Sequence, residues 1–270
     1  MTETTDYVQH VLAHYKEEAS KHGASSASTM WDTTTRSREL DAIVRLIRHV
    51  AGSQLASQRL LEIGAGNGVL LAHLQQVMPE ISPVALEFSR DMLNVAEQRG
   101  LPNVKLVHGD VRAMPFPDAS FDLVVSERCI INLMQRDHQQ EAFAQVARVL
   151  RPGGHFICIE AFSDGHQAMN QARDELGMPA IPQAHHNLWF DKAWFKQQLE
   201  GAFEFVNLAA SSELPQENFL SSHYFVSRVL YPAISKREVM YNTSFVQFFD
   251  FLPPAGNFSP IQLFLLRRRG

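Results

Sequence analysis

The chain has 270 residues, of which 45% are hydrophobic and 10% aromatic, which is enough to fill a core and argues against disorder. A formal net charge of −5, without a clustered basic face, argues against nucleic acid as a partner. Two cysteines without metal or CxxC spacing, a polar start and the absence of long apolar runs predict a cytoplasmic protein that has no membrane span and binds no metal.

Strands and helices alternate along the middle of the chain. The predicted strands are 59–64, 82–88, 103–110, 121–127, 154–160, 203–210 and 261–268, and the predicted helices are 68–77, 89–100, 138–150 and 191–201. Continuously apolar strands separated by helices predict a mostly parallel α/β sheet covered on both faces. Ligands of such sheets bind beyond the carboxyl ends of the strands, so the residues that follow each strand are the candidate site.

Three segments stand outside this alternation, and long segments of this kind often form lids or binding loops. Residues 1–36 are predicted to be a helical lid before a domain of residues 37–270, with Tyr15, Trp31 and Arg36 as candidates for contacts with the substrate. The alternative is that Trp31 packs at the domain edge and Arg36 is solvated near a helix that starts at Ser37.

Two insertions are predicted at 161–190 and 211–260. The second is rich in phenylalanine and tyrosine. Its aromatic residues are interpreted as packing against the sheet edge, as the wall of an acceptor pocket, or as a surface for a homodimer.

A glycine-rich loop, Gly64-Ala65-Gly66-Asn67-Gly68, joins the first strand to its helix. Glycine permits positive φ and lets a ligand approach the backbone, and a helix start offers free N–H groups. The dinucleotide pattern GxGxxG does not fit, because Val69 stands where the last glycine is required. The loop alone is also compatible with an ordinary tight turn.

Three acids at the carboxyl ends of successive strands strengthen the case for a ligand. Glu62 precedes the loop, Glu87 ends the second strand and Asp110 ends the third. Crowded carboxylates repel one another unless a ligand uses them. Glu87 is placed to accept hydrogen bonds from a ribose diol and Asp110 from an exocyclic amine. Glu62 is placed to orient an ammonium group or the loop itself. Apolar faces for an adenine ring are expected from Phe88, Met92 and Val111.

The segments "LLEIGAGNGVL", "PVALEFSRDML", "VHGDVRAMPFPDASFDLVVSE" and "ARVLRPGGHFICIE" resemble, in order and spacing, the signatures of class I S-adenosylmethionine-dependent methyltransferases. The resemblance covers about residues 60–160. It implies a Rossmann-like, seven-stranded sheet whose last strand is antiparallel, and S-adenosylmethionine as cofactor. It also implies that the glycine loop (Gly64, Ala65, Gly66) lies under the amino-acid part of the cofactor. The further contacts that it implies are the ribose at Glu87, the adenine at Asp110 and Val111, and the methionine end at Ser126 and Glu127.

The chain lacks the NPPY-type signature of enzymes that methylate nucleic-acid bases, since "SERC" follows the fourth strand. A general base is required only for a hydroxyl or a protonated amine. His185 and His186 in the first insertion and Glu127 are the candidates, and Glu160 is a weaker one. The alternative for the two histidines is a capping or surface position before the helix at Asp191. The alternative for Glu127 is a contact with the ammonium group of the cofactor.

The sequence therefore predicts a methyltransferase that acts on oxygen or nitrogen of a small-molecule acceptor, with a biosynthetic or sugar-like metabolite favoured. Three alternatives remain: a methyltransferase acting on protein or lipid-linked glycan, a catalytically silent cofactor-binding scaffold, and a nicotinamide oxidoreductase, which Val69 disfavours.

Overall fold

The computed structural model describes residues 16–17, 20–21, 23, 25 and 30–270. In chain order its elements are α2 (Thr33–Ala51), η2 (Gly52–Ser57), β1 (Leu60–Ile63), α3 (Val69–Val77), β2 (Val84–Glu87), α4 (Arg90–Gln98), β3 (Lys105–His108), η3 (Val111–Ala113), β4 (Phe121–Glu127), η4 (Ile130–Asn132), α5 (Arg136–Val149), β5 (Leu150–Ala161), α6 (Ser163–Glu175), α7 (Lys192–Leu199), β6 (Phe203–Phe205), η5 (Leu208–Ala210), α8 (Ser221–Phe225), η6 (Val226–Leu230), α9 (Tyr231–Ser235), α10 (Ser244–Phe248), η7 (Phe249–Phe251) and β7 (Ile261–Arg268).

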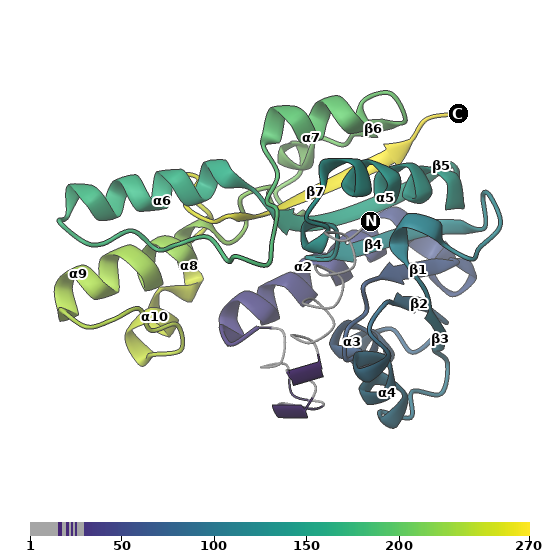
Figure 1. Cartoon of the computed structure of the whole chain (residues 1–270), viewed down its shortest axis with the longest axis horizontal. Coiled ribbons are helices and arrows are strands. Elements are labelled where there is room, and N and C mark those ends of the chain that lie inside the picture. Colours follow the sequence, from purple (N-terminus) through teal and green to yellow (C-terminus); the bar gives the residue numbers. More distant parts are fainter. Residues whose placement is uncertain (1–15, 18–19, 22, 24, 26–29) are drawn as a thin grey trace, which may run out of the picture.

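The strands of this part of the chain form one seven-stranded sheet in the order β3-β2-β1-β4-β5-β7-β6 (Figure 1). β1 to β5 pair in parallel, and β7 is antiparallel to both β5 and β6. This confirms the predicted Rossmann-like fold, including its antiparallel last strand.

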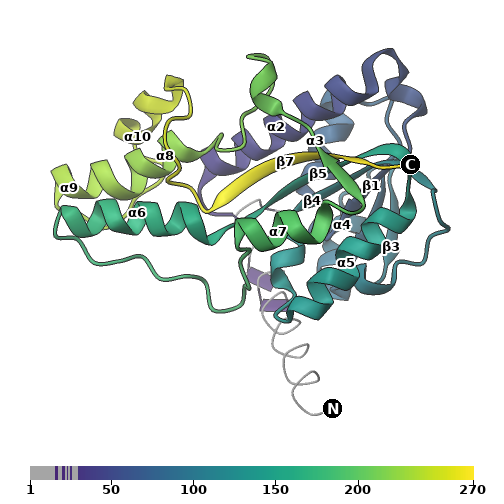
Figure 2. The same ribbon diagram turned by 90° about the horizontal axis from the view of Figure 1, so that it is seen from above.

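Helices cover both faces of the sheet, as Figure 2 shows for α2 and α3 on one side and α5 and α7 on the other. Each face has its own apolar core. Leu46, Leu70 and Ile157 belong to the first core, and Phe143, Phe156 and Phe195 to the second. Aliphatic side chains on both faces of each central strand explain the continuous apolar runs in the sequence.

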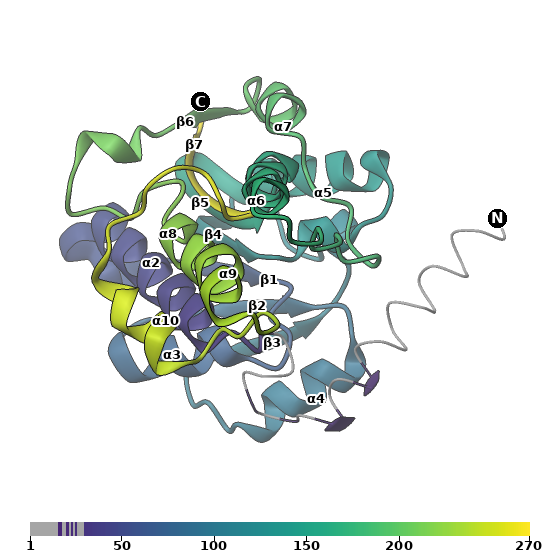
Figure 3. The same ribbon diagram turned by 90° about the vertical axis from the view of Figure 1, so that its left-hand side faces the viewer.

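The two insertions form a helical arm beside the sheet, built from α6, α8, η6, α9 and α10 (Figures 1 and 3). α8, η6 and α9 follow one another without a break from Ser221 to Ser235, with a π-helical segment at Val226–Leu230. Helical segments at residues 221–235 and 244–251 therefore make up just under half of the second insertion.

The N-terminal boundary differs from the prediction. α2 begins at Thr33, with Asp32 as its N-cap, and continues through the boundary expected between residues 36 and 37. Arg36 therefore lies inside the helix and is only 7% exposed, so the alternative of a solvated arginine near a helix start is wrong.

Candidate active site

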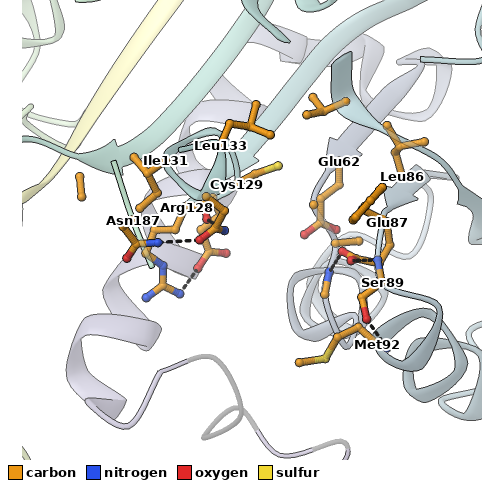
Figure 4. Close-up of a pocket in the computed structure, with 18 of the residues that line it drawn as sticks. Glu62, Leu86, Glu87, Ser89, Met92, Arg128, Cys129, Ile131, Leu133 and Asn187 are labelled. Carbon is orange, nitrogen blue, oxygen red and sulfur yellow. Dashed lines mark hydrogen bonds and ion pairs between the residues drawn. The ribbon is translucent and has the colours of Figure 1, made fainter. Parts of the chain in front are cut away.

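A cavity of about 360 Å³ lies at the carboxyl ends of β1 to β4, where the parallel fold predicts a ligand site. Figure 4 shows its two facing walls, with Glu62 and Glu87 on one and Arg128, Cys129 and Asn187 on the other. The cavity lining includes most of the predicted site residues: Arg36, Glu62, Gly64, Ala65, Gly66, Glu87, Phe88, Met92, Asp110, Val111, Glu127 and His186.

The glycine loop is shaped by its backbone. Gly64, Gly66 and Gly68 all have positive φ, at 69°, 55° and 76°. A Cβ atom added to Gly64 would lie 2.5 Å from Sγ of Cys129 on the opposite wall. Glycine at position 64 is thus required by both conformation and space, and this explains the first glycine of the pattern.

Glu87 links the loop to the next helix. One carboxylate oxygen accepts from the backbone N–H of Gly66 and the other from that of Ser89, each at 2.7 Å. Ser89 in turn caps α4, as predicted, by accepting from the N–H of Met92. Burial raises the pKa of Glu87, and the backbone hydrogen bonds oppose this shift.

Glu62 carries a carboxylate oxygen, Oε2, that is buried and has no hydrogen-bond partner in the described part of the chain. Burial, and then the negative charge of Glu127, raise its pKa well above the ordinary value. A buried carboxylate oxygen without a protein donor is able to accept a hydrogen bond from a ligand. An ammonium group, with three N–H donors and a positive charge, suits that acceptor, as the amino-acid part of S-adenosylmethionine would provide.

The predicted adenine-binding residues all line the cavity. Phe88 is 36% exposed, while Met92 and Val111 are buried. Asp110 caps η3 and forms an ion pair with Arg112 at 2.6 Å. Burial opposes ionisation of Asp110, but hydrogen bonds from Arg112 hold its pKa below the usual value. Asp110 is therefore a hydrogen-bond acceptor at the cavity edge.

A cluster of four largely buried charged residues lies at the end of β4. Two of them, Glu39 and Arg128, were not among the site residues predicted from the sequence. Arg36 and Glu39 of α2 meet Glu127 and Arg128, with a hydrogen bond from Arg36 to Glu127 and a distance of 3.4 Å from Arg128 to Glu39. Burial favours the neutral form of Glu127, but the two guanidinium groups hold its pKa below the ordinary value. Burial raises the pKa of Glu39 to about 8, aided by the charge of Glu127. A carboxylate held ionised by two arginines is a poor base, which disfavours that role for Glu127.

Ser126 does not line the cavity. Its side chain is completely buried, and its hydroxyl donates to Glu160 behind the wall. Glu160 also accepts from the N–H groups of Cys129, Ile130 and Ile131 and thereby fixes the turn after β4. Burial raises the pKa of Glu160 to about 7. Neither side chain faces a ligand, so both support the wall of the site from behind.

Of the two histidines, only His186 lines the cavity. His185 is exposed, and its ring packs edge-on against the ring of His186, with 5.3 Å between the ring centres. Trp31 is 64% exposed and lies outside the cavity lining. Tyr15 lies outside the described residues. The N-terminal segment does reach the glycine loop, because the amide of Asn67 donates to the carbonyl oxygens of Gly23 and Ser25, each at 2.9 Å.

Comparison with known proteins agrees with this geometry. Residues 60–154 match the family model of the methyltransferase domain. Residues 60–154 therefore form a methyltransferase domain of the class I, S-adenosylmethionine-dependent type. It is 37% identical over 108 residues to a demethylmenaquinone methyltransferase of Geobacillus kaustophilus, covering 38% of this chain and 45% of the relative. It is 30% identical over 135 residues to the ubiquinone/menaquinone biosynthesis C-methyltransferase of Pseudomonas putida, covering 48% of this chain and 52% of the relative.

The chain thus spans about half the length of these curated relatives. Solved structures extend the likeness of the fold. The PH0226 protein of Pyrococcus horikoshii aligns with a TM-score of 0.50 at 21% identity, covering 63% of this chain and 82% of that one. A protein studied for the conversion of a disulfide bond into a thioacetal group during echinomycin biosynthesis aligns with a TM-score of 0.51 at 18% identity, covering 86% and 84%.

Within the described residues, no helix is long and apolar enough to cross a membrane, and no group of histidine, cysteine and acidic side chains is arranged to hold a metal ion.

Proposed function

We propose that the protein transfers a methyl group from S-adenosylmethionine to a small-molecule acceptor bound in the same cavity. The observation that carries this proposal is the convergence of three features on one cavity: the positive-φ glycine loop, Glu87 beside it, and the unpartnered oxygen of Glu62. When bound, the cofactor supplies an electrophilic methyl group on a sulfonium sulfur.

The residues of the chain would bind, orient and enclose the reactants. Glu62 would accept from the cofactor ammonium group and Glu87 from the ribose hydroxyls through its remaining lone pairs. Asp110, Phe88 and Val111 would hold the adenine. Alignment of this kind accounts for a large part of the rate of an in-line displacement.

The acceptor would lie at the other end of the cavity, against residues that include His186, Asn187, Trp189, Tyr224 and Ile261. His186 is the candidate that can take a proton from a hydroxyl or amine acceptor. One of the relatives is named a C-methyltransferase, so carbon joins oxygen and nitrogen as an acceptor atom. A cavity between two facing walls also favours a small acceptor over a protein or a lipid-linked glycan.

The first test is a calorimetric titration with S-adenosylhomocysteine. We expect one micromolar site per chain, and a loss of roughly 2–4 kcal/mol of binding free energy in Glu87→Ala, because charge-assisted hydrogen bonds are removed. Glu97→Ala, an exposed acid on α4, is the matched control and should bind like the wild type.

Absence of binding at millimolar ligand would contradict the proposal and support a silent scaffold. Unchanged affinity in Glu87→Ala would contradict the ribose assignment only.

We also propose that the arm mediates a homodimer. Exposed large apolar side chains are concentrated there, with Phe248 and Phe251 at 68% and 70% exposure and Ile234 at 56%.

A further inference from the structure

Tyr224 enters the cavity from the arm. It lies on α8, is only 6% exposed and lines the cavity. Its hydroxyl makes no hydrogen bond with any described residue, yet it is not among the buried polar atoms that are sealed from solvent. A hydroxyl that is open to a ligand cavity and lacks a protein partner is available to hydrogen-bond with a ligand.

The ring of Tyr224 is held rigidly on its other side. The guanidinium carbon of Arg228 lies 3.5 Å from the ring centre, and the ring of Tyr241 lies 4.4 Å from the same atom. Arg228 donates to Asp32 at 2.9 Å and to Ser227 at 2.7 Å. A buried arginine that is stacked between rings and paired with a carboxylate has little freedom, so the direction of Tyr224 is fixed before a ligand binds.

Asp32 connects this unit to the rest of the site. Its carboxylate also accepts from His223 at 2.8 Å and from the N–H of Thr35, where it caps α2. α2 carries Arg36, which lines the same cavity. The arm and α2 therefore meet at one buried carboxylate, and Tyr224 is positioned relative to the cofactor end of the cavity.

We infer that Tyr224 contacts the methyl acceptor and donates a hydrogen bond to an oxygen of it, which selects small acceptors that carry an oxygen atom. This inference rests on the proposed methyltransferase function. Burial raises the pKa of Tyr224 to about 12, so the phenol stays protonated and acts as a donor, not as a base. Pro260 and Ile261 line the cavity as well and would contact the apolar part of the acceptor.

The test measures transfer of tritium-labelled methyl groups to a panel of probes: a naphthalenediol, a simple methyl glycoside, and an arylamine and an arylthiol without oxygen. We expect transfer to at least one of the two oxygen-bearing probes. We expect Tyr224→Phe to lower kcat/KM for that probe by roughly 10- to 100-fold, because an oxygen bound to a rigid donor loses its partner. Affinity for S-adenosylhomocysteine, measured by calorimetry, should be unchanged.

Tyr231→Phe is the matched control, because Tyr231 is also buried in the arm but its hydroxyl contacts Met240 outside the cavity lining. It should retain wild-type kinetics. Equal kcat/KM in Tyr224→Phe and wild type would overturn the inference, as would transfer to the oxygen-free probes alone or to no probe at all. A protein that fails to bind S-adenosylhomocysteine would overturn the proposed function itself, which separates the two failures.

Discussion

Gly64 shows how a single missing side chain shapes the site. Gly64→Ala should destabilise the protein by roughly 2–5 kcal/mol, since a left-handed alanine is strained and its Cβ would collide with Cys129. Chemical denaturation by urea at fixed pH measures this change.

Gly100→Ala provides the control, because Gly100 also has positive φ, at 61°, but a Cβ there would meet nothing within 4 Å. The free energy of unfolding of Gly100→Ala should fall by only about 1 kcal/mol. Equal losses in the two variants would show that backbone strain alone, and not the contact with Cys129, explains glycine at position 64.

We expect Glu62 to make binding of the proposed cofactor dependent on pH. Its pKa is raised in the free protein, mainly by burial, so a proton is bound more tightly than by an ordinary glutamate. A bound ammonium group would stabilise the carboxylate and release that proton. Affinity for S-adenosylhomocysteine should therefore rise as the pH is raised above the range in which an ordinary glutamate titrates.

Calorimetry in buffers of different ionisation enthalpy measures the released proton directly. In Glu62→Gln, which keeps the size and removes the titration, proton release should disappear. Release that persists undiminished in this variant would assign it to another group, of which Glu87 is the nearest candidate.

Most residues of the cavity lining could be predicted because they lie at the carboxyl ends of strands that are visible in the sequence. Glu62, Glu87 and Asp110 are of this kind. Ser126 was misplaced because the position after a strand does not say which way a side chain turns, and here Glu160 draws it behind the wall. Glu39 and Arg128 could not be paired from the sequence, since they are far apart along the chain and no local pattern connects them.

At the scale of the elements, Asp32 at the start of α2 caps the helix and also pairs with His223 and Arg228. Asp32→Ala should lower stability by roughly 3–5 kcal/mol, because it removes the cap and leaves Arg228 buried without its carboxylate. Thermal or urea unfolding measures the loss.

Asp191→Ala is the comparison, because Asp191 caps α7 by the same bond, to the N–H of Trp194 at 2.8 Å, but is exposed. The free energy of unfolding of Asp191→Ala should fall by about 1 kcal/mol. A similar loss in both variants would mean that the contacts of Asp32 with His223 and Arg228 contribute nothing measurable.

Element boundaries were predicted best where apolar runs end in clear signals. β4 and β7 have their predicted bounds, and Ser89 caps α4. β6 was predicted to reach residue 210 but ends at Phe205, because Asn207 caps a short helical turn at Leu208–Ala210. α2 was placed too late because three threonines, which are poor helix formers, follow its cap.

At the scale of the whole molecule, the sequence left the role of the arm open among sheet packing, a pocket wall and a dimer surface. If the arm mediates a dimer, sedimentation of the wild type should show two chains, and Phe248→Asp combined with Phe251→Asp should give a monomer. Both rings are exposed and lie 5.8 Å apart, so these changes remove surface contacts without disturbing the core.

Glu238→Lys in the same arm, also exposed, is the control for a general effect of charge. A wild-type protein that sediments as a monomer at all concentrations would contradict the dimer and leave the arm with its role in the cavity wall.

The position of β7 has a consequence for how the molecule assembles. Among the described strands, β6 pairs only with β7, and β7 lies between β5 and β6 although it follows both in the sequence. β6 therefore has no place in the sheet until more than fifty further residues, including those of the arm, have been made and folded back. Contacts between distant parts of a chain slow folding. During synthesis the edge of β5 should remain open, and this half of the sheet is where a chaperone or a misfolded pairing would act first.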